Sequence, residues 1–95
     1  MRIRGLASSE LKKRMRPFEK EIAALEARIA ALTKETEVVR GSLADPALYD
    51  GGEQGERLKD LTVAEARLSA GLACAEEEWL HLQARLDALR REPAA

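Results

Sequence analysis

The sequence predicts an all-α protein, specifically a two-helix antiparallel coiled-coil hairpin. Two long runs carry an apolar residue at every third or fourth position, which is the spacing of an amphipathic helix. Alanine, leucine, glutamate, arginine and lysine dominate the composition, as in long helices and coiled coils. Between the runs lies the pair Asp45-Pro46, where we expect the chain to turn back.

Length and composition limit the classes of function. The 95 residues fit one small domain, and the formal net charge of −1 neither favours nor excludes a nucleic-acid partner. A two-helix hairpin has no enclosed centre, so we expect no sizeable catalytic pocket and no enzymatic activity in these residues. The chain shows no apolar run of membrane-spanning length and no signal-peptide core, so we expect a cytoplasmic protein without membrane contact.

The first helix is expected over about residues 9–44, after a basic tail or linker end at residues 1–8. Pro17 interrupts the pattern, which predicts either a kink there or a helix that truly begins at this proline. The apolar positions follow an unbroken heptad, which predicts a left-handed supercoil. They are Leu11, Met15, Phe18, Ile22, Leu25, Ile29, Leu32, Thr36, Val39 and Leu43.

The turn is expected at residues 45–53. Asp45 can cap a helical turn, Pro46 suits the first position of that turn, and Leu48 and Tyr49 should cover the tip. Gly51 and Gly52 add conformational freedom just beyond it.

The second helix is expected over about residues 54–91, and it carries the same heptad spacing. Its seam positions are Leu58, Leu61, Glu65, Leu68, Leu72, Ala75, Trp79, Leu82, Leu86 and Leu89. Residues that face one another in an antiparallel pair share a constant sum of residue numbers. Sums of 97 and 104 both fit, and both place Trp79 between Phe18 and Leu25 as a core anchor.

Candidate catalytic and metal-binding groups do not converge. His81 and Cys74 lie outside the seam, and the three carboxylates of residues 76–78 point to different sides of a helix, so we interpret all of them as surface residues. The sequence contains no phosphate-binding loop, dinucleotide fingerprint or metal-protease motif. We therefore expect no cofactor in this chain.

Charge is distributed unevenly along the hairpin. Residues 1–20 hold seven basic and two acidic side chains (+5), and residues 85–95 hold three basic and two acidic (+1). A hairpin brings these segments together as a cationic end that can contact phosphates. We call its candidate nucleic-acid-binding residues the basic foot: Lys12, Lys13, Arg14, Arg16, Lys20, Arg85, Arg90 and Arg91.

Some apolar residues fall outside the heptad seam. Leu48, Tyr49, Val63 and Leu80 would form an adhesive edge if several were exposed together, so a homodimer is an alternative to a monomer.

Two motifs at this separation resemble a known module. They are Leu-Ala-Asp-Pro-Ala-Leu-Tyr at residues 43–49 and Glu-Glu-Trp-Leu at residues 77–80, supported by Arg-Pro-Phe at residues 16–18. Together with the heptads they resemble the C-terminal coiled-coil domain of the F subfamily of ABC ATPases, over about residues 9–90. In that family two ATPase domains precede the hairpin, members act on ribosomes in translation, and the hairpin has been linked to nucleic-acid binding.

The resemblance implies a contact module for DNA or ribosomal RNA that works with the parent protein's ATPase domains. ATP and Mg²⁺ would belong to those domains, and the residues matching the family motif, Asp45, Pro46, Tyr49 and Trp79, would be structural. The alternative function is a protein-interaction or oligomerisation coiled coil that binds no nucleic acid.

Overall fold

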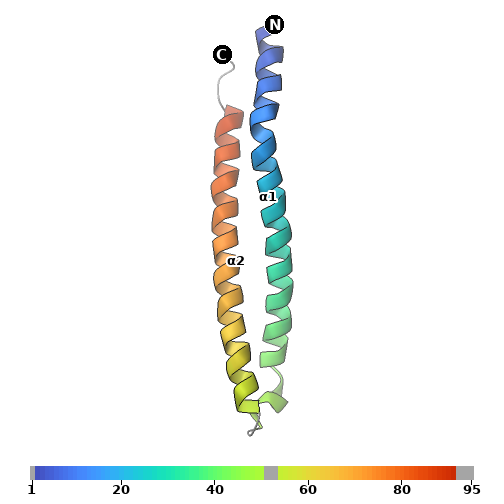
Figure 1. Ribbon diagram of the computed structural model, residues 1–95, viewed down its shortest axis with the longest axis vertical. Coiled ribbons are helices and arrows are strands. Elements are labelled where there is room, and N and C mark those ends of the chain that lie inside the picture. The colour runs from blue at the N-terminus through green and yellow to red at the C-terminus, as the bar shows by residue number, and fades with distance from the viewer. Residues whose placement is uncertain (1, 51–53, 92–95) are drawn as a thin grey trace. The chain divides into compact units, whose positions relative to one another are not determined.

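The computed structural model describes residues 2–50 and 54–91, with side chains described from residue 9 onward. Helix α1 spans Arg2–Leu43, a short 3₁₀ helix η1 spans Pro46–Tyr49, and helix α2 spans Gln54–Arg91 (Figure 1). The described residues contain no strand. The predicted fold class, an all-α two-helix antiparallel hairpin, is confirmed.

The chain divides into two compact units. The terminal unit combines Met1–Ala27 with Glu76–Ala95, and the tip unit is the continuous segment Arg28–Ala75. Each unit therefore takes one stretch of α1 and one stretch of α2, which run antiparallel.

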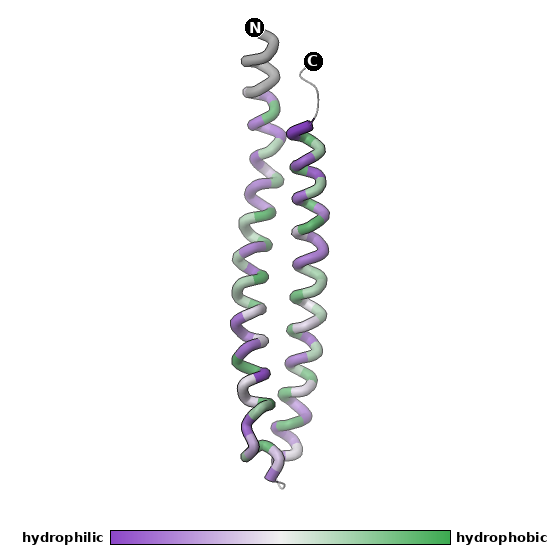
Figure 2. The backbone as a smooth tube through the Cα atoms, turned by 180° about the vertical axis from the view of Figure 1, so that it is seen from behind, coloured by the Kyte–Doolittle hydropathy of each residue, from purple (hydrophilic) through white to green (hydrophobic). Residues whose placement is uncertain are grey.

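The heptad seam is the buried face of both helices. In the terminal unit Ile22, Leu25, Leu82 and Leu86 are buried, and in the tip unit Ala75 and Thr36 are buried. The other predicted seam positions are half-buried, whereas most residues between them are exposed. Figure 2 shows the resulting alternation of hydrophobic and hydrophilic residues along both helices. Removing this apolar stripe from water is the main stabilising term of such a pair.

The structure distinguishes the two registers that the sequence leaves open. In the tip unit, a Cβ built on Gly71 lies 3.8 Å from Cδ1 of Leu32, and these residue numbers sum to 103. In the terminal unit, Arg85 lies over the ring of Phe18, again with a sum of 103. A sum of 97 would set Leu32 opposite a residue six positions from Gly71, about 9 Å along the helix. The register is therefore the one near 104.

Thr36 is the polar residue buried in this seam. Its hydroxyl donates a hydrogen bond to the carbonyl of Leu32 at 2.7 Å, so the group is satisfied within its own helix.

The turn is built from local hydrogen bonds. Asp45 caps η1, because its Oδ1 accepts a hydrogen bond from the backbone N–H of Ala47 at 3.0 Å. Pro46 opens η1, where the N–H that proline lacks would have no partner in the helix anyway. Leu48 is buried, and the hydroxyl of Tyr49 donates to the carbonyl of Leu43 at 2.6 Å. That bond satisfies a carbonyl left open at the end of α1.

The beginning of α1 differs from the expectation. The helix starts at Arg2, seven residues before the expected position, and it continues through Pro17. A helix start at Pro17 is therefore wrong. Extending an existing helix costs little compared with nucleating one. Pro17 and Lys13 are both exposed, so the Lys13 carbonyl that loses its helical donor can bond to water.

The other expected boundaries can be compared directly. Helix α1 ends at Leu43 where 44 was expected, and α2 spans Gln54–Arg91 where about 54–91 was expected. Gly51, Gly52 and residue 53 of the expected turn lie outside the described residues. Within the described part of the chain, neither helix contains a stretch long and apolar enough to cross a bilayer.

Candidate nucleic-acid interface

The basic foot lies wholly within the terminal unit, and all eight of its side chains are exposed. Five come from α1 and three from the last two turns of α2. Lys12, Arg16 and Lys20 are spaced by four residues and therefore share one outer face of α1, with Lys13 beside them. From Lys12 to Lys20 this cationic stripe spans about 12 Å of helix.

Arg85 connects the two helices of the terminal unit. Its guanidinium carbon lies 5.1 Å from the centre of the Phe18 ring, within the range of a cation–π interaction. Phe18 is half-buried in the seam, while Arg85 is exposed. The ring thus holds a cation of α2 against the seam side of α1, away from the outer face that carries the cationic stripe, and Arg85 remains exposed to solvent.

Two other arginines of the foot have their own interactions. Arg90 forms an ion pair with Asp87 at 3.6 Å, and both side chains are about half exposed (52% and 53%). Exposed pairs of this kind contribute little and are screened by salt, so Arg90 remains able to exchange Asp87 for a phosphate. Arg14 also has an interaction partner.

The sequence locates the cations of the foot but not the Phe18–Arg85 contact. Phe18 is predicted only as a seam residue, and Arg85 only as a charge. The contact depends on the register of the two helices. Only the register in which facing residue numbers sum to about 104 places Phe18 beside residues 85 and 86.

Trp79 lies in the seam of the terminal unit, and the observed register sets it opposite Leu25. It is half-buried, and its indole Nε1 is fully shielded from solvent. No residue in the described part of the chain accepts a hydrogen bond from that N–H. The indole is an anchor with a desolvation cost, because a buried donor without an acceptor is unfavourable.

The groups considered for chemistry are all at the surface. Cys74, His81 and the carboxylates of residues 76–78 are exposed. The described residues include no group of three or more His, Cys, Asp or Glu side chains that could hold a metal ion.

The adhesive edge expected from the sequence needs a correction. Leu48 is 5% exposed, because η1 turns its side chain inward, so it cannot contribute to such an edge. Tyr49, Val63 and Leu80 are exposed as required. The most exposed large apolar residue among those described is instead Val38, at 66%, which the heptad analysis missed because its neighbour Val39 occupies the seam.

Comparison with known proteins gives one match. Residues 9–84 match the family model described as the ABC transporter C-terminal domain. Searches of curated proteins and of solved structures gave no match.

Proposed function

Because the chain belongs to the ABC transporter C-terminal domain family, we propose that it is the nucleic-acid-contacting hairpin of an ABC protein of the F subfamily that acts in translation. The basic foot makes the contact. The observation that carries this proposal is the concentration of eight exposed cationic side chains, from both helices, within the terminal unit.

The ligand is the phosphate backbone of DNA or ribosomal RNA. A duplex carries one negative charge per about 1.7 Å of its axis, so the 12 Å stripe of α1 meets several phosphates. Arg85, held by Phe18, adds a planar guanidinium that suits bidentate contact with a phosphate. Lysine and arginine contacts of this kind position a protein on nucleic acid without reading bases, so binding should be indifferent to sequence.

The parent protein supplies the rest of the function. Its ATPase domains bind ATP and Mg²⁺ in the cytoplasm, and the hairpin adds affinity for the ribosome or another nucleic acid. The isolated chain should therefore bind weakly, because contacts made by those domains are missing.

Fluorescence anisotropy with a labelled DNA duplex and an RNA stem of equal length tests this proposal. With four to six phosphate contacts, the logarithm of affinity should fall with the logarithm of salt concentration with a slope of roughly −4 to −5. The triple variant K12E/K13E/R16E reverses the outer stripe and should abolish binding to both probes.

A matched control reverses three exposed cations of the tip unit, in R40E/R57E/K59E, and so changes the net charge equally. This variant should bind far better than the stripe variant. Equal loss in both variants would show that only net charge matters, and unchanged binding by the stripe variant would exclude the basic foot. Circular dichroism verifies that each variant keeps its helices.

One observation favours the alternative, an interaction coiled coil. The tip unit carries an apolar groove that is separate from the basic foot. Affinity for a partner that does not change with salt would support this function over the first.

A further inference from the structure

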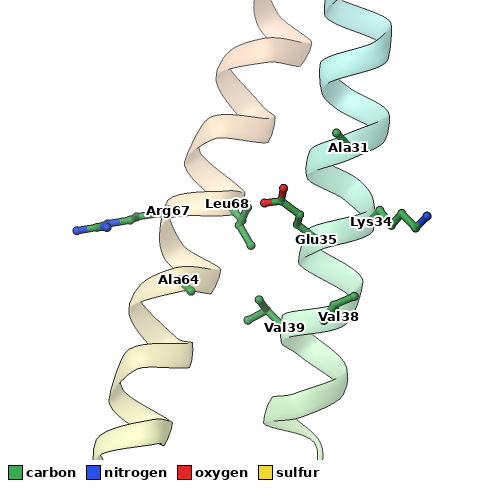
Figure 3. A pocket seen from close by; sticks show the side chains of 8 residues that line it. All are labelled: Ala31, Lys34, Glu35, Val38, Val39, Ala64, Arg67 and Leu68. Carbon is green, nitrogen blue, oxygen red and sulfur yellow. The ribbon is translucent and has the colours of Figure 1, made fainter.

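The groove of the tip unit lies along one flank of the two helices. Ala31, Glu35, Val38 and Val39 line it from α1, and Ala64 and Leu68 line it from α2, with Lys34 and Arg67 at its edges (Figure 3). In Figure 3 Glu35 points across the groove toward α2, whereas Lys34 and Arg67 point outward. Val38 is 66% exposed, so the wall formed by α1 is unfilled apolar surface. A third helix laid along this flank would bury it.

Charges on the same flank of α1 have a simple arrangement. Arg28 lies about one helical turn before Ala31, and Glu35 lies about one turn after it. Both charged side chains are exposed, and neither forms an ion pair with another residue in the described ranges. Ala31, between them, is exposed and small enough to let a neighbouring helix approach closely.

The charges on this flank of α1 are complementary to those on the same flank of a second copy that runs antiparallel to it. In an antiparallel helix pair related by a two-fold axis, like flanks face each other and opposing residue numbers share a constant sum. A two-fold axis beside Ala31 makes the numbers of facing residues sum to about 63. Arg28 of each copy then faces Glu35 of the other copy, which gives two equivalent pairs. A flank with charges of one sign would instead repel its own copy.

We propose that the tip unit is a self-association surface, on which a second copy of this chain packs its α1 antiparallel to α1 around Ala31. The α1 helix of the second copy lies in the groove, with two symmetric ion pairs between Arg28 of one copy and Glu35 of the other. It continues over Val38 and covers the wall formed by Ala64 and Leu68. This inference goes beyond the proposed function, because Arg28 and Glu35 lie outside the basic foot.

Charge exchange tests the interface on the full chain. Each of the single variants R28E and E35R replaces two opposite-charge contacts by two like-charge contacts, so sedimentation equilibrium should show the dimer weakened by about tenfold or more. The double variant R28E/E35R restores both pairs and should recover dimerisation. The two single variants, each impaired alone, should associate with one another when mixed.

Matched controls lie on the same helix. The variants R40E and E37R make the same charge changes at exposed positions on other faces of α1 and should leave the dimer intact. The variant V38D places a charge on the groove wall and should also abolish association, while circular dichroism verifies that the helices remain.

Three results would overturn the proposal. They are a strict monomer at millimolar concentration, equal effects of R28E and R40E on the dimer, and failure of the mixed single variants to associate.

Discussion

Replacing Gly71 with alanine should stabilise the protein, although the residue lies in the seam region of α2. Glycine inside a helix costs about 0.8–1.0 kcal/mol relative to alanine. The added Cβ would meet Cδ1 of Leu32 at 3.8 Å, an ordinary van der Waals distance, so no clash offsets that gain. Gly71 is half-buried, so its new methyl group would also gain part of the roughly 0.8 kcal/mol of a buried methylene.

The two contributions together amount to about 1 to 1.5 kcal/mol. For a domain of this size that corresponds to a rise in Tm of roughly 4–12 °C. Urea unfolding followed by circular dichroism measures the free energy, and a thermal scan measures Tm. The reference variant is Gly41→Ala, whose Cβ would meet nothing within 4 Å and which lies close to the end of α1. Its gain should be smaller.

A larger side chain at this position should have the opposite effect. Gly71→Leu would drive its branched end into Leu32, and overpacking of this kind costs typically 1–3 kcal/mol. A destabilising Gly71→Ala would refute the reasoning, because it would mean that the Leu32 side chain leaves no room for the added methyl group.

Substitutions at three other residues test individual contacts by urea unfolding. Trp79→Ala should cost about 3 kcal/mol, whereas Trp79→Phe should cost clearly less, because phenylalanine keeps an aromatic ring in the seam and does not bury an N–H that lacks an acceptor. An equal cost for both would mean that the ring retained in Trp79→Phe does not contribute to packing. Thr36→Val should change stability by less than about 1 kcal/mol, because both the hydroxyl and its 2.7 Å hydrogen bond disappear together; a large loss would give that bond a structural role. Tyr49→Phe should cost about 0.5–1.5 kcal/mol through the lost bond to Leu43, and no loss would show that water replaces it.

The heptads predict the two-helix fold, but they do not predict the register between the two helices. Apolar spacing identifies the buried face of each helix without a structure, because burial follows the helical period. Apolar spacing leaves two registers open, because sliding one helix past the other by one heptad again sets seam positions opposite seam positions. Only contacts between helices, such as Gly71 with Leu32 and Arg85 with Phe18, distinguish them.

The start of α1 and the groove escape sequence reasoning for different reasons. Pro17 is a strong breaker on average, but the structure tolerates it on an exposed face. Val38 lies next to a seam residue, so the period assigns it to the solvent side. Its significance appears only when α2 contributes the second wall of the groove. The cations of the basic foot, by contrast, can be counted in the sequence once a hairpin is assumed.

The most direct test of the proposed function is an NMR titration of the isotope-labelled chain with a DNA duplex and with an RNA stem at low salt. Binding through the basic foot should shift the signals of residues 12–20 and 85–91, including the side-chain N–H of Arg85, and these shifts should vanish when salt is raised. Residues 43–50 of the turn should stay unchanged. Shifts centred on the turn or on the groove of the tip unit, or no shifts with either probe, would contradict the assignment of the basic foot as the nucleic-acid interface.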